Sequence, residues 1–328
     1  MKALITGATG FIGSHLAEHL HEKGYELRAL IRPSSDTKWL KHLPVEYVTG
    51  SFSDIASLVP AVRDVDVIYH VAGVVAARDR KGFFDGNQLA TANLMDAVIE
   101  ANPSLARFVH VSSQAACGPS PSADRPVDES MPMRPITTYG ESKAAAEREV
   151  IERMSVIPST IVRPPAVYGP RDVGVYTFFQ VVGRGLAPLI GFDRKLVSLI
   201  HARDLVRGFV MAGEASVAEG ETYFISSERF YDWKEVGEIT ARVMGRRRPR
   251  YLNVPHPIIF GVAAVNGFMG RFMKKPPILD FEKGRDLTQG FWTCSVEKAS
   301  RDLGFEESLT IEAGIEDTVG WYRHHGWL

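Results

Sequence analysis

The first fifteen residues constrain the fold of this chain more than any other stretch. The segment M-K-A-L-I-T-G-A-T-G-F-I-G-S-H begins with a short apolar run, passes three glycines spaced three apart, and enters a helical apolar pattern. This order predicts a strand, a tight turn and a helix. Glycine permits a sharp bend and close approach of the backbone to a ligand, and a helix N-terminus attracts anions. Similar turns also connect strands to helices in proteins that bind nothing there.

Composition excludes several classes of protein. The 328 residues are 45% hydrophobic with a formal net charge of −1, so we expect a globular protein of about two domains that binds no nucleic acid. Cys117 and Cys294 are the only cysteines, and they lack the spacing of a metal site. We therefore expect no disulfide framework, no metal and a reducing, cytoplasmic location. The apolar start is broken at Gly7, which argues against a signal peptide, and no stretch predicts a transmembrane segment.

Strand and helix patterns alternate after the glycine turn, which predicts a doubly wound parallel α/β sheet. Ligands bind at the carboxyl ends of the strands in such sheets. The second expected strand, 26–31, ends at Ile31, where an NAD site usually has a carboxylate for the ribose 2′-OH. Arg32 follows and suits a 2′-phosphate. We therefore expect NADP(H), with NAD(H) as the alternative if Arg32 is simply an exposed loop residue.

Two further motifs carry chemistry. The central strand R-F-V-H-V-S-S ends in Ser112 and Ser113, and a later helix begins with Tyr139 and Lys143, four residues apart. Residues with this spacing share one helix face. An ammonium group near a phenol favours the phenolate and moves its pKa toward neutral pH, where it can carry a proton. Together with the glycine turn, these motifs predict a hydride-transfer site.

The glycine turn, the S-S strand end and Y-G-E-S-K, in this order, resemble the extended short-chain dehydrogenases/reductases, the NAD-dependent epimerase/dehydratase superfamily. The resemblance covers nearly the whole chain. It implies a Rossmann-type α/β fold with a smaller, mostly helical C-terminal substrate domain. The implied boundaries are 1–166 and 196–226 for the dinucleotide-binding domain, and 167–195 and 227–328 for the substrate domain.

The resemblance also implies roles for individual residues. Tyr139 would exchange a proton with the substrate oxygen, Ser113 would hydrogen-bond that oxygen with Ser112 in reserve, and Lys143 would hold the nicotinamide ribose. The implied cofactor contacts are Gly7, Thr9, Gly10, Phe11, Ile12, Gly13, Arg32, Ser51, Phe52, Val71, Ala72, Gly73, Asn87, Ser112, Tyr139, Lys143, Pro164 and Val167. Ser51 departs from the family pattern, which has an aspartate there beside adenine. His70 and Asn93 are expected to be structural.

Departures from the family pattern narrow the range of substrates that we expect. Arg171 and Asp172 follow V-Y-G-P, where sugar-nucleotide epimerases carry an asparagine, and Gln114 and Ala115 replace the Asp-Glu pair of the dehydratases. The remaining pattern resembles dihydroflavonol reductases and 3β-hydroxysteroid dehydrogenases. We therefore expect NAD(P)-dependent interconversion of a secondary alcohol and a ketone on an apolar or mid-sized small molecule. The alternatives are an NDP-sugar epimerase using bound NAD, and a non-catalytic NADP(H) sensor.

The C-terminal part contains one unusual stretch. Residues 256–273 are strongly apolar but punctuated by glycine and interrupted by Asn266 and Arg271. We interpret this stretch as a core or dimer-interface helix. A helix that lines a greasy pocket or rests on a membrane surface, with peripheral contact to lipid, is the alternative. A homodimer is compatible with the sequence, which does not determine the oligomeric state.

Overall fold

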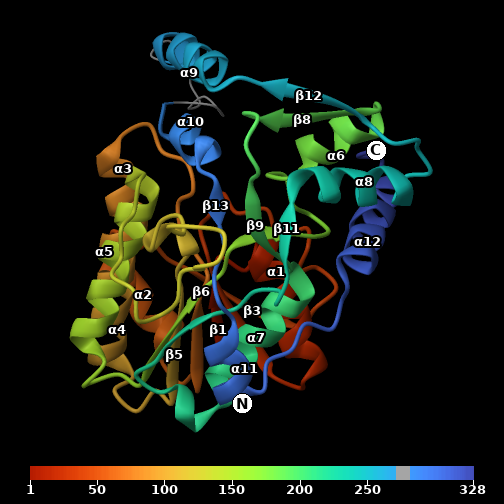
Figure 1. Cartoon of the computed structure of the whole chain (residues 1–328). Coiled ribbons are helices and arrows are strands. Elements are labelled where there is room, and N and C mark those ends of the chain that lie inside the picture. Colours follow the sequence, from red (N-terminus) through yellow and green to blue (C-terminus); the bar gives the residue numbers. More distant parts are fainter. Residues whose placement is uncertain (271–280) are drawn as a thin grey trace.

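A seven-stranded parallel sheet forms the centre of the protein (Figure 1). The computed structural model describes residues 1–270 and 281–328. The strand order is β10-β6-β5-β4-β1-β2-β3, and every neighbouring pair is parallel. The strands are β1 (Lys2–Thr6), β2 (Glu26–Ile31), β3 (Val45–Thr49), β4 (Val67–His70), β5 (Arg107–Val111), β6 (Ser159–Arg163) and β10 (Thr222–Phe224). The predicted doubly wound α/β fold is confirmed.

Helices cover both faces of this sheet, which explains why its inner strands are apolar along their whole length. On one face lie α1 (Phe11–Glu22), α7 (Ala202–Glu214) and α11 (Glu297–Leu303), which bury an apolar cluster that includes Leu16 and Phe209. On the other lie α2 (Ile55–Val62), α4 (Ala90–Ala101) and α5 (Thr138–Arg153), around a cluster that includes Leu58 and Leu94. The strand order reverses between β1 and β4, and such a reversal opens a ligand crevice at the carboxyl ends of the strands.

A second, smaller unit lies beside the carboxyl edge of the main sheet. It holds a sheet of β7 (Ala166–Tyr168), β9 (Leu196–His201), β11 (Phe230–Asp232) and β13 (Phe291–Trp292), and a ribbon of β8 (Leu186–Ile190) and β12 (Arg250–Val254). Its helices are α6 (Tyr176–Gly183), α8 (Trp233–Val243) and α12 (Ile311–His324), which pack around buried aromatic side chains such as Phe179, Tyr231 and Tyr322. The domain boundaries stay a prediction, since β9 pairs in this smaller sheet whereas the following α7 and β10 belong to the main one.

Three more helices stand at the carboxyl end of the main sheet. They are α3 (Arg80–Phe84), α9 (His256–Gly270) and α10 (Phe281–Thr288). Figure 1 shows α9 at the extreme end of the molecule, beyond the β8/β12 ribbon and above α10. No helix within residues 1–270 or 281–328 combines the length and the apolar character needed to cross a bilayer. Arg271, which the sequence places in the same apolar stretch, lies outside the described residues.

Candidate active site

The glycine turn between β1 and α1 is closely packed against the end of β4. Gly7 has a φ of +73°, and a Cβ there would lie 2.8 Å from the amide nitrogen of Ala72. A Cβ on Gly13 would lie 2.2 Å from the carbonyl oxygen of Gly7, which in turn accepts a hydrogen bond from Gly10 N at 3.0 Å. Helix α1 begins without a side-chain cap and without an acidic residue in its first turn. Its first N–H groups are therefore suited to an external anion.

Buried polar residues fix the Val71–Gly73 segment against this turn. The hydroxyl of Thr6 donates to His70 Nδ1 at 2.8 Å and accepts from Ala72 N at 3.2 Å. His70 Nε2 donates to Thr91 Oγ1 at 3.0 Å, because the Thr91 hydroxyl itself donates to the Asn87 carbonyl. Burial lowers the pKa of His70 to about 3, so its ring is neutral and acts as a spacer between β1 and α4. The role of His70 is structural.

Asn87 lies in a π-helical turn, Asp85–Leu89, just before α4. Its Oδ1 accepts from Val74 N at 2.7 Å, and its Nδ2 donates to Val74 O at 3.0 Å and to Ser142 Oγ at 2.8 Å. The amide therefore joins the segment after β4 to α5. A Cβ on Gly73 would lie 3.0 Å from Asn87 Oδ1 and 3.8 Å from Lys143 Nζ, so this glycine keeps a narrow space open beside the ammonium group.

Ser113, Tyr139 and Lys143 come together at the end of β5. Burial raises the pKa of the Tyr139 phenol, and a hydrogen bond with the Ser113 hydroxyl partly offsets this rise. Lys143 is buried one turn further along α5, and its Nζ donates to the carbonyl of Val111 at 2.6 Å. Burial lowers the pKa of Lys143 to about 8. The carboxyl edge of the sheet therefore carries the phenol of Tyr139, the hydroxyl of Ser113 and the ammonium group of Lys143, whose pKa is lowered.

A buried ion pair that the sequence did not reveal lies behind these residues. The hydroxyl of Ser112 donates to Glu147 Oε1 at 2.5 Å, and Glu147 Oε2 lies 2.6 Å from Nη2 of Arg163 on β6. Ser112 is thus engaged with Glu147, and Ser113 is the serine that contacts Tyr139. The available signal was the spacing: Tyr139, Lys143 and Glu147 follow one another at four-residue intervals on one face of α5.

The other predicted cofactor residues lie along the same edge of the sheet but outside this cluster. Arg32 directly follows β2, its side chain is exposed, and its backbone N–H donates to Ser35 Oγ at 3.0 Å. Ser51 follows β3, and its hydroxyl lies 2.8 Å from that of Ser53. The carbonyl of the neighbouring Phe52 accepts from Asn93 Nδ2 at 2.6 Å, a structural contact.

The remaining predicted contacts belong to two segments. Pro164 follows β6, and its carbonyl accepts from Gln114 N at 2.8 Å, which continues the pairing of β5 with β6 beyond their ends. Val167 lies in β7, opposite Ile200 of β9. Thr9 lies in the glycine turn, and Phe11 and Ile12 open helix α1.

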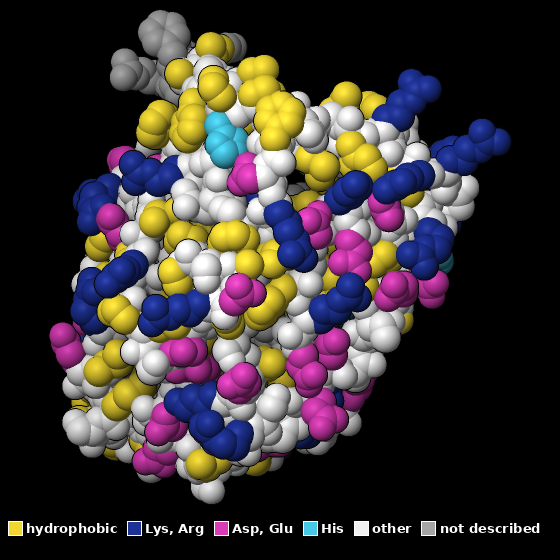
Figure 2. All heavy atoms as spheres, viewed as in Figure 1, with side chains coloured by type: hydrophobic (Ala, Val, Ile, Leu, Met, Phe, Trp, Pro, Cys, Tyr) yellow, Lys and Arg dark blue, Asp and Glu magenta, His cyan; other side chains and the backbone are white. Residues whose placement is uncertain are grey.

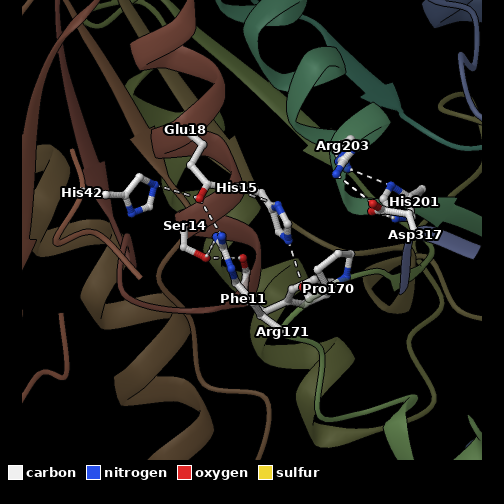
Figure 3. A network of polar contacts seen from close by, with 10 residues as sticks. All are labelled: Phe11, Ser14, His15, Glu18, His42, Pro170, Arg171, His201, Arg203 and Asp317. Carbon is white, nitrogen blue, oxygen red and sulfur yellow. Dashed lines mark hydrogen bonds and ion pairs between the residues drawn. The ribbon is translucent and has the colours of Figure 1, made fainter. Parts of the chain in front are cut away.

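A polar network ties the glycine-turn helix to the smaller unit (Figure 3). Arg171, which has a φ of +74°, reaches from the loop after β7 to Ser14 Oγ at 3.0 Å and to Glu18 Oε1 at 2.6 Å on α1. Next to it, His15 Nε2 lies 2.9 Å from the carbonyl of Pro170. No pattern in the sequence predicts these contacts, which join residues more than 150 positions apart. They hold α1 and the smaller unit in one arrangement.

Residues 3–226 match the model of the NAD dependent epimerase/dehydratase family. The chain belongs to this family. The predicted resemblance to the extended short-chain dehydrogenases is thereby confirmed, and the family is one of NAD-dependent oxidoreductases and related enzymes.

Individual relatives agree with this assignment. The chain is 32% identical to ceramide reductase of Caulobacter vibrioides (99% of this chain, 95% of the relative) and 32% identical to sterol demethylase protein B of Methylococcus capsulatus (100% of both). A 3-beta-hydroxysteroid dehydrogenase of Mycolicibacterium neoaurum is 25% identical over 98% of this chain and 91% of its own length. The crystal structure of gox2253 is similar with a TM-score of 0.82 and 27% identity, covering 99% of this chain and 98% of the other.

Proposed function

We propose that this protein is an NADP(H)-preferring oxidoreductase that interconverts a secondary alcohol and a ketone on an apolar, lipid-sized substrate. The observation that carries the proposal is the contact between the Ser113 hydroxyl and the Tyr139 phenol, with Lys143 one helical turn away. A phenol that is hydrogen-bonded to a hydroxyl, with a buried ammonium one helical turn away, is suited to moving a proton onto or off an alcohol oxygen.

The residues present fit a nicotinamide dinucleotide. The turn at Gly7 and Gly13 has no room for a Cβ, and the uncapped start of α1 offers N–H groups to a pyrophosphate. Lys143 would hold the nicotinamide ribose beside Gly73, and Arg32 would pair with a 2′-phosphate. When bound, the cofactor supplies or accepts the hydride.

The protein's own residues then handle the proton. Tyr139 donates its phenolic proton to the oxygen of a ketone as the alcohol forms, or removes the alcohol proton in the reverse direction. Ser113 hydrogen-bonds the same oxygen and stabilises its developing charge. Lys143 has a pKa of about 8 and is largely protonated at pH 7. A positive charge one helical turn from Tyr139 favours the phenolate and so opposes the rise in the pKa of Tyr139 that burial causes.

The substrate class is inferred from two observations. The chain lacks the asparagine and the Asp-Glu pair that mark the sugar-nucleotide members of the family, as the sequence shows at Gln114, Ala115, Arg171 and Asp172. Its relatives include proteins named for ceramide, sterol and 3β-hydroxysteroid chemistry. These molecules are apolar and carry a hydroxyl group, so we propose a substrate of the same kind.

The experiment is a turnover screen with purified protein. NADPH and NADH are titrated against the protein, and ketosteroids and long-chain ketones are then screened by cofactor absorbance. We expect Tyr139→Phe to bind NADPH as the wild type does and to lose turnover at least about a hundredfold. Tyr47→Phe, at an exposed tyrosine on β3, is the matched control and keeps full turnover. Turnover retained by Tyr139→Phe, or epimerisation of a UDP-sugar without net cofactor consumption, would overturn the proposal.

A further inference from the structure

Helix α9 presents an apolar face to the outside of the molecule. Ile258, Val262 and Val265 are 54%, 45% and 58% exposed, and their spacing of four and three residues places them on one side of the helix. Ile259 and Ala263 on the other side are buried. The sequence of α9 contains no Asp, Glu, Lys or Arg. The apolar pattern of this stretch predicts a core or dimer-interface helix. Burial in the core is wrong for the exposed face, because that face packs against nothing in the described chain, whereas the dimer interface stays a prediction.

Other exposed apolar side chains lie around this face. Phe192 follows β8 and is 77% exposed, Leu252 lies on β12 directly before α9, and Phe281 opens α10 with its ring 5.1 Å from that of Phe260 on α9. The loop that carries Phe192 contacts the start of α9, where His256 Nε2 lies 3.8 Å from Asp193 Oδ1. We call the residues Phe192, Leu252, Ile258, Val262, Val265 and Phe281 the end patch. Figure 2 shows hydrophobic side chains gathered at this end of the molecule.

Four arginines gather at the end of the β8/β12 ribbon where both strands begin, whereas Phe192 and α9 follow the ends of these strands. Arg184 lies just before β8, Arg246 and Arg247 lie in the loop that leads to β12, and Arg250 opens β12 opposite Leu186. All four are exposed, and within the described residues none of them forms an ion pair with an acidic side chain. Figure 2 shows Lys and Arg side chains projecting from the molecule near this upper edge. The ribbon thus connects the apolar end patch at one end to a group of cationic side chains at the other.

The charged groups closest to the patch do not reverse this sign. Asp193, next to Phe192, is paired with Lys195 at 3.2 Å. Glu238 is paired with Arg248 at 2.6 Å. Arg194 lies 3.9 Å from Asp232. The acidic side chains near the ribbon therefore already have cationic partners, and the group of arginines keeps a net positive charge.

Helix α10 connects the end patch to the candidate active site. Glu282 accepts hydrogen bonds from Thr138 N at 2.8 Å and Thr138 Oγ1 at 2.5 Å, and Arg285 donates to the carbonyl of Ile136 at 3.3 Å. Thr138 is the residue directly before Tyr139. The face that α9 exposes therefore lies one helix away from the proposed proton-transfer residue.

We propose that the end patch docks this protein peripherally on an anionic lipid bilayer. The apolar face of α9 would enter the region of the headgroups and acyl chains, and Arg184, Arg246, Arg247 and Arg250 would meet anionic headgroups. Docking in this orientation turns the α10 side of the active site toward the membrane, from which an apolar substrate can enter. That last step rests on the proposed function, whereas docking itself does not.

The charges favour a bilayer over a second copy of this chain. A two-fold interface brings the same patch of both copies together. The end patch offers no acidic side chain on α9 to meet the arginines of a second copy. An anionic lipid surface supplies both the apolar layer and the negative charge.

The test measures binding of the full chain to vesicles in the absence of substrate. Vesicles of phosphatidylcholine alone are compared with vesicles that contain about one quarter phosphatidylglycerol, using sedimentation. We expect at least about tenfold tighter binding to the anionic vesicles, weakened by added salt. The double variant Ile258→Glu/Val262→Glu should abolish binding, and Arg246→Glu/Arg247→Glu should remove the preference for anionic lipid.

Matched controls separate docking from folding and from function. The control is the double variant Ile151→Glu/Val217→Glu, which introduces the same two negative charges as the α9 variant at side chains of similar exposure. It should leave vesicle binding unchanged. Circular dichroism and NADPH binding report whether each variant is folded. Vesicle binding without any turnover would count against the proposed function and leave docking intact. The docking proposal is overturned if the wild type ignores anionic vesicles, if the α9 variant binds them equally well, or if sedimentation velocity shows a dimer that this variant dissociates.

Discussion

Glu147 and Arg163 form an ion pair beneath the proposed catalytic residues, with both side chains buried and Glu147 Oε2 2.6 Å from Arg163 Nη2. The pair joins α5 to the end of β6, and the second carboxylate oxygen accepts from Ser112 on the β5 side. Helix α5 is thereby fixed to two strands at the level of Lys143. Because Glu147 is negative, it also raises the pKa of Lys143 and partly offsets the effect of burial.

Replacing Glu147 with Gln should change both stability and the pH profile. The amide has the shape of the carboxylate but leaves the Arg163 charge unpaired, which costs about 3–5 kcal/mol in a buried site. Loss of the negative charge lowers the pKa of Lys143 below about 8, so the alkaline limb of kcat/KM moves to lower pH. Urea unfolding and a pH–rate profile measure the two effects.

The double variant Glu147→Gln/Arg163→Met separates these effects. Removing the unpaired guanidinium restores part of the stability, but the alkaline limb stays at the lower pH because the carboxylate is still absent. An alkaline limb that is the same in the wild type and in both variants would contradict the influence of Glu147 on Lys143.

The glycine turn predicts a sharp difference between two Gly→Ala substitutions in helices. In Gly13→Ala the new Cβ meets the Gly7 carbonyl at 2.2 Å, so the turn must shift. We expect a loss of about 1–3 kcal/mol in stability and at least about tenfold weaker NADPH binding. Gly320→Ala, on the exposed side of α12 with no atom within 4 Å, should gain about 0.5–1 kcal/mol and bind NADPH normally. Thermal unfolding and fluorescence titration compare the two, and equal effects would refute the steric argument.

Arg32 gives a test of cofactor preference. A charge-assisted hydrogen bond to a 2′-phosphate contributes about 1.5–3 kcal/mol, so Arg32→Ala should weaken NADPH binding about 10- to 100-fold and leave NADH binding unchanged. Arg148→Ala, an exposed arginine on α5, is the control. Tighter binding of NADH than of NADPH by the wild type would contradict this role of Arg32.

The parts of the site that follow from local spacing were predictable from the sequence. Gly7 and Gly13 are separated by a fixed number of residues in one turn, and Tyr139 and Lys143 share a helix face at any position in a fold. The strand order then brings Ser113 to the same edge, because parallel strands expose their carboxyl ends together. Each of these relations needs only the period of a helix or a strand.

Relations between distant segments were not predictable in this way. Arg171 meets Glu18 from a loop 153 residues away, and its left-handed backbone gives no pattern in the sequence. The apolar stretch that contains Ile258 was correctly predicted as a helix, but its packing was not. Periodicity locates an apolar face, whereas burial depends on whether another element covers it.

The buried, neutral His70 predicts how the free energy of unfolding changes in acid. His70 is held between Thr6 and Thr91 with its Nδ1 as an acceptor, and burial lowers its pKa to about 3, with a smaller contribution from Lys143. The unfolded chain takes up a proton at about pH 6.5, whereas the folded chain does not until about pH 3. The unfolded state therefore binds more protons in this window, and the free energy of unfolding falls by about 1.4 kcal/mol per pH unit for this residue as pH decreases. Urea unfolding at several pH values between about 6 and 4, which lie between these two pKa values, measures the slope. The variant His70→Gln keeps a hydrogen-bond acceptor and a donor but does not titrate. The pH dependence of its free energy of unfolding should therefore be shallower by about 1.4 kcal/mol per pH unit. Identical slopes in the variant and the wild type would show that His70 is already charged in the folded protein.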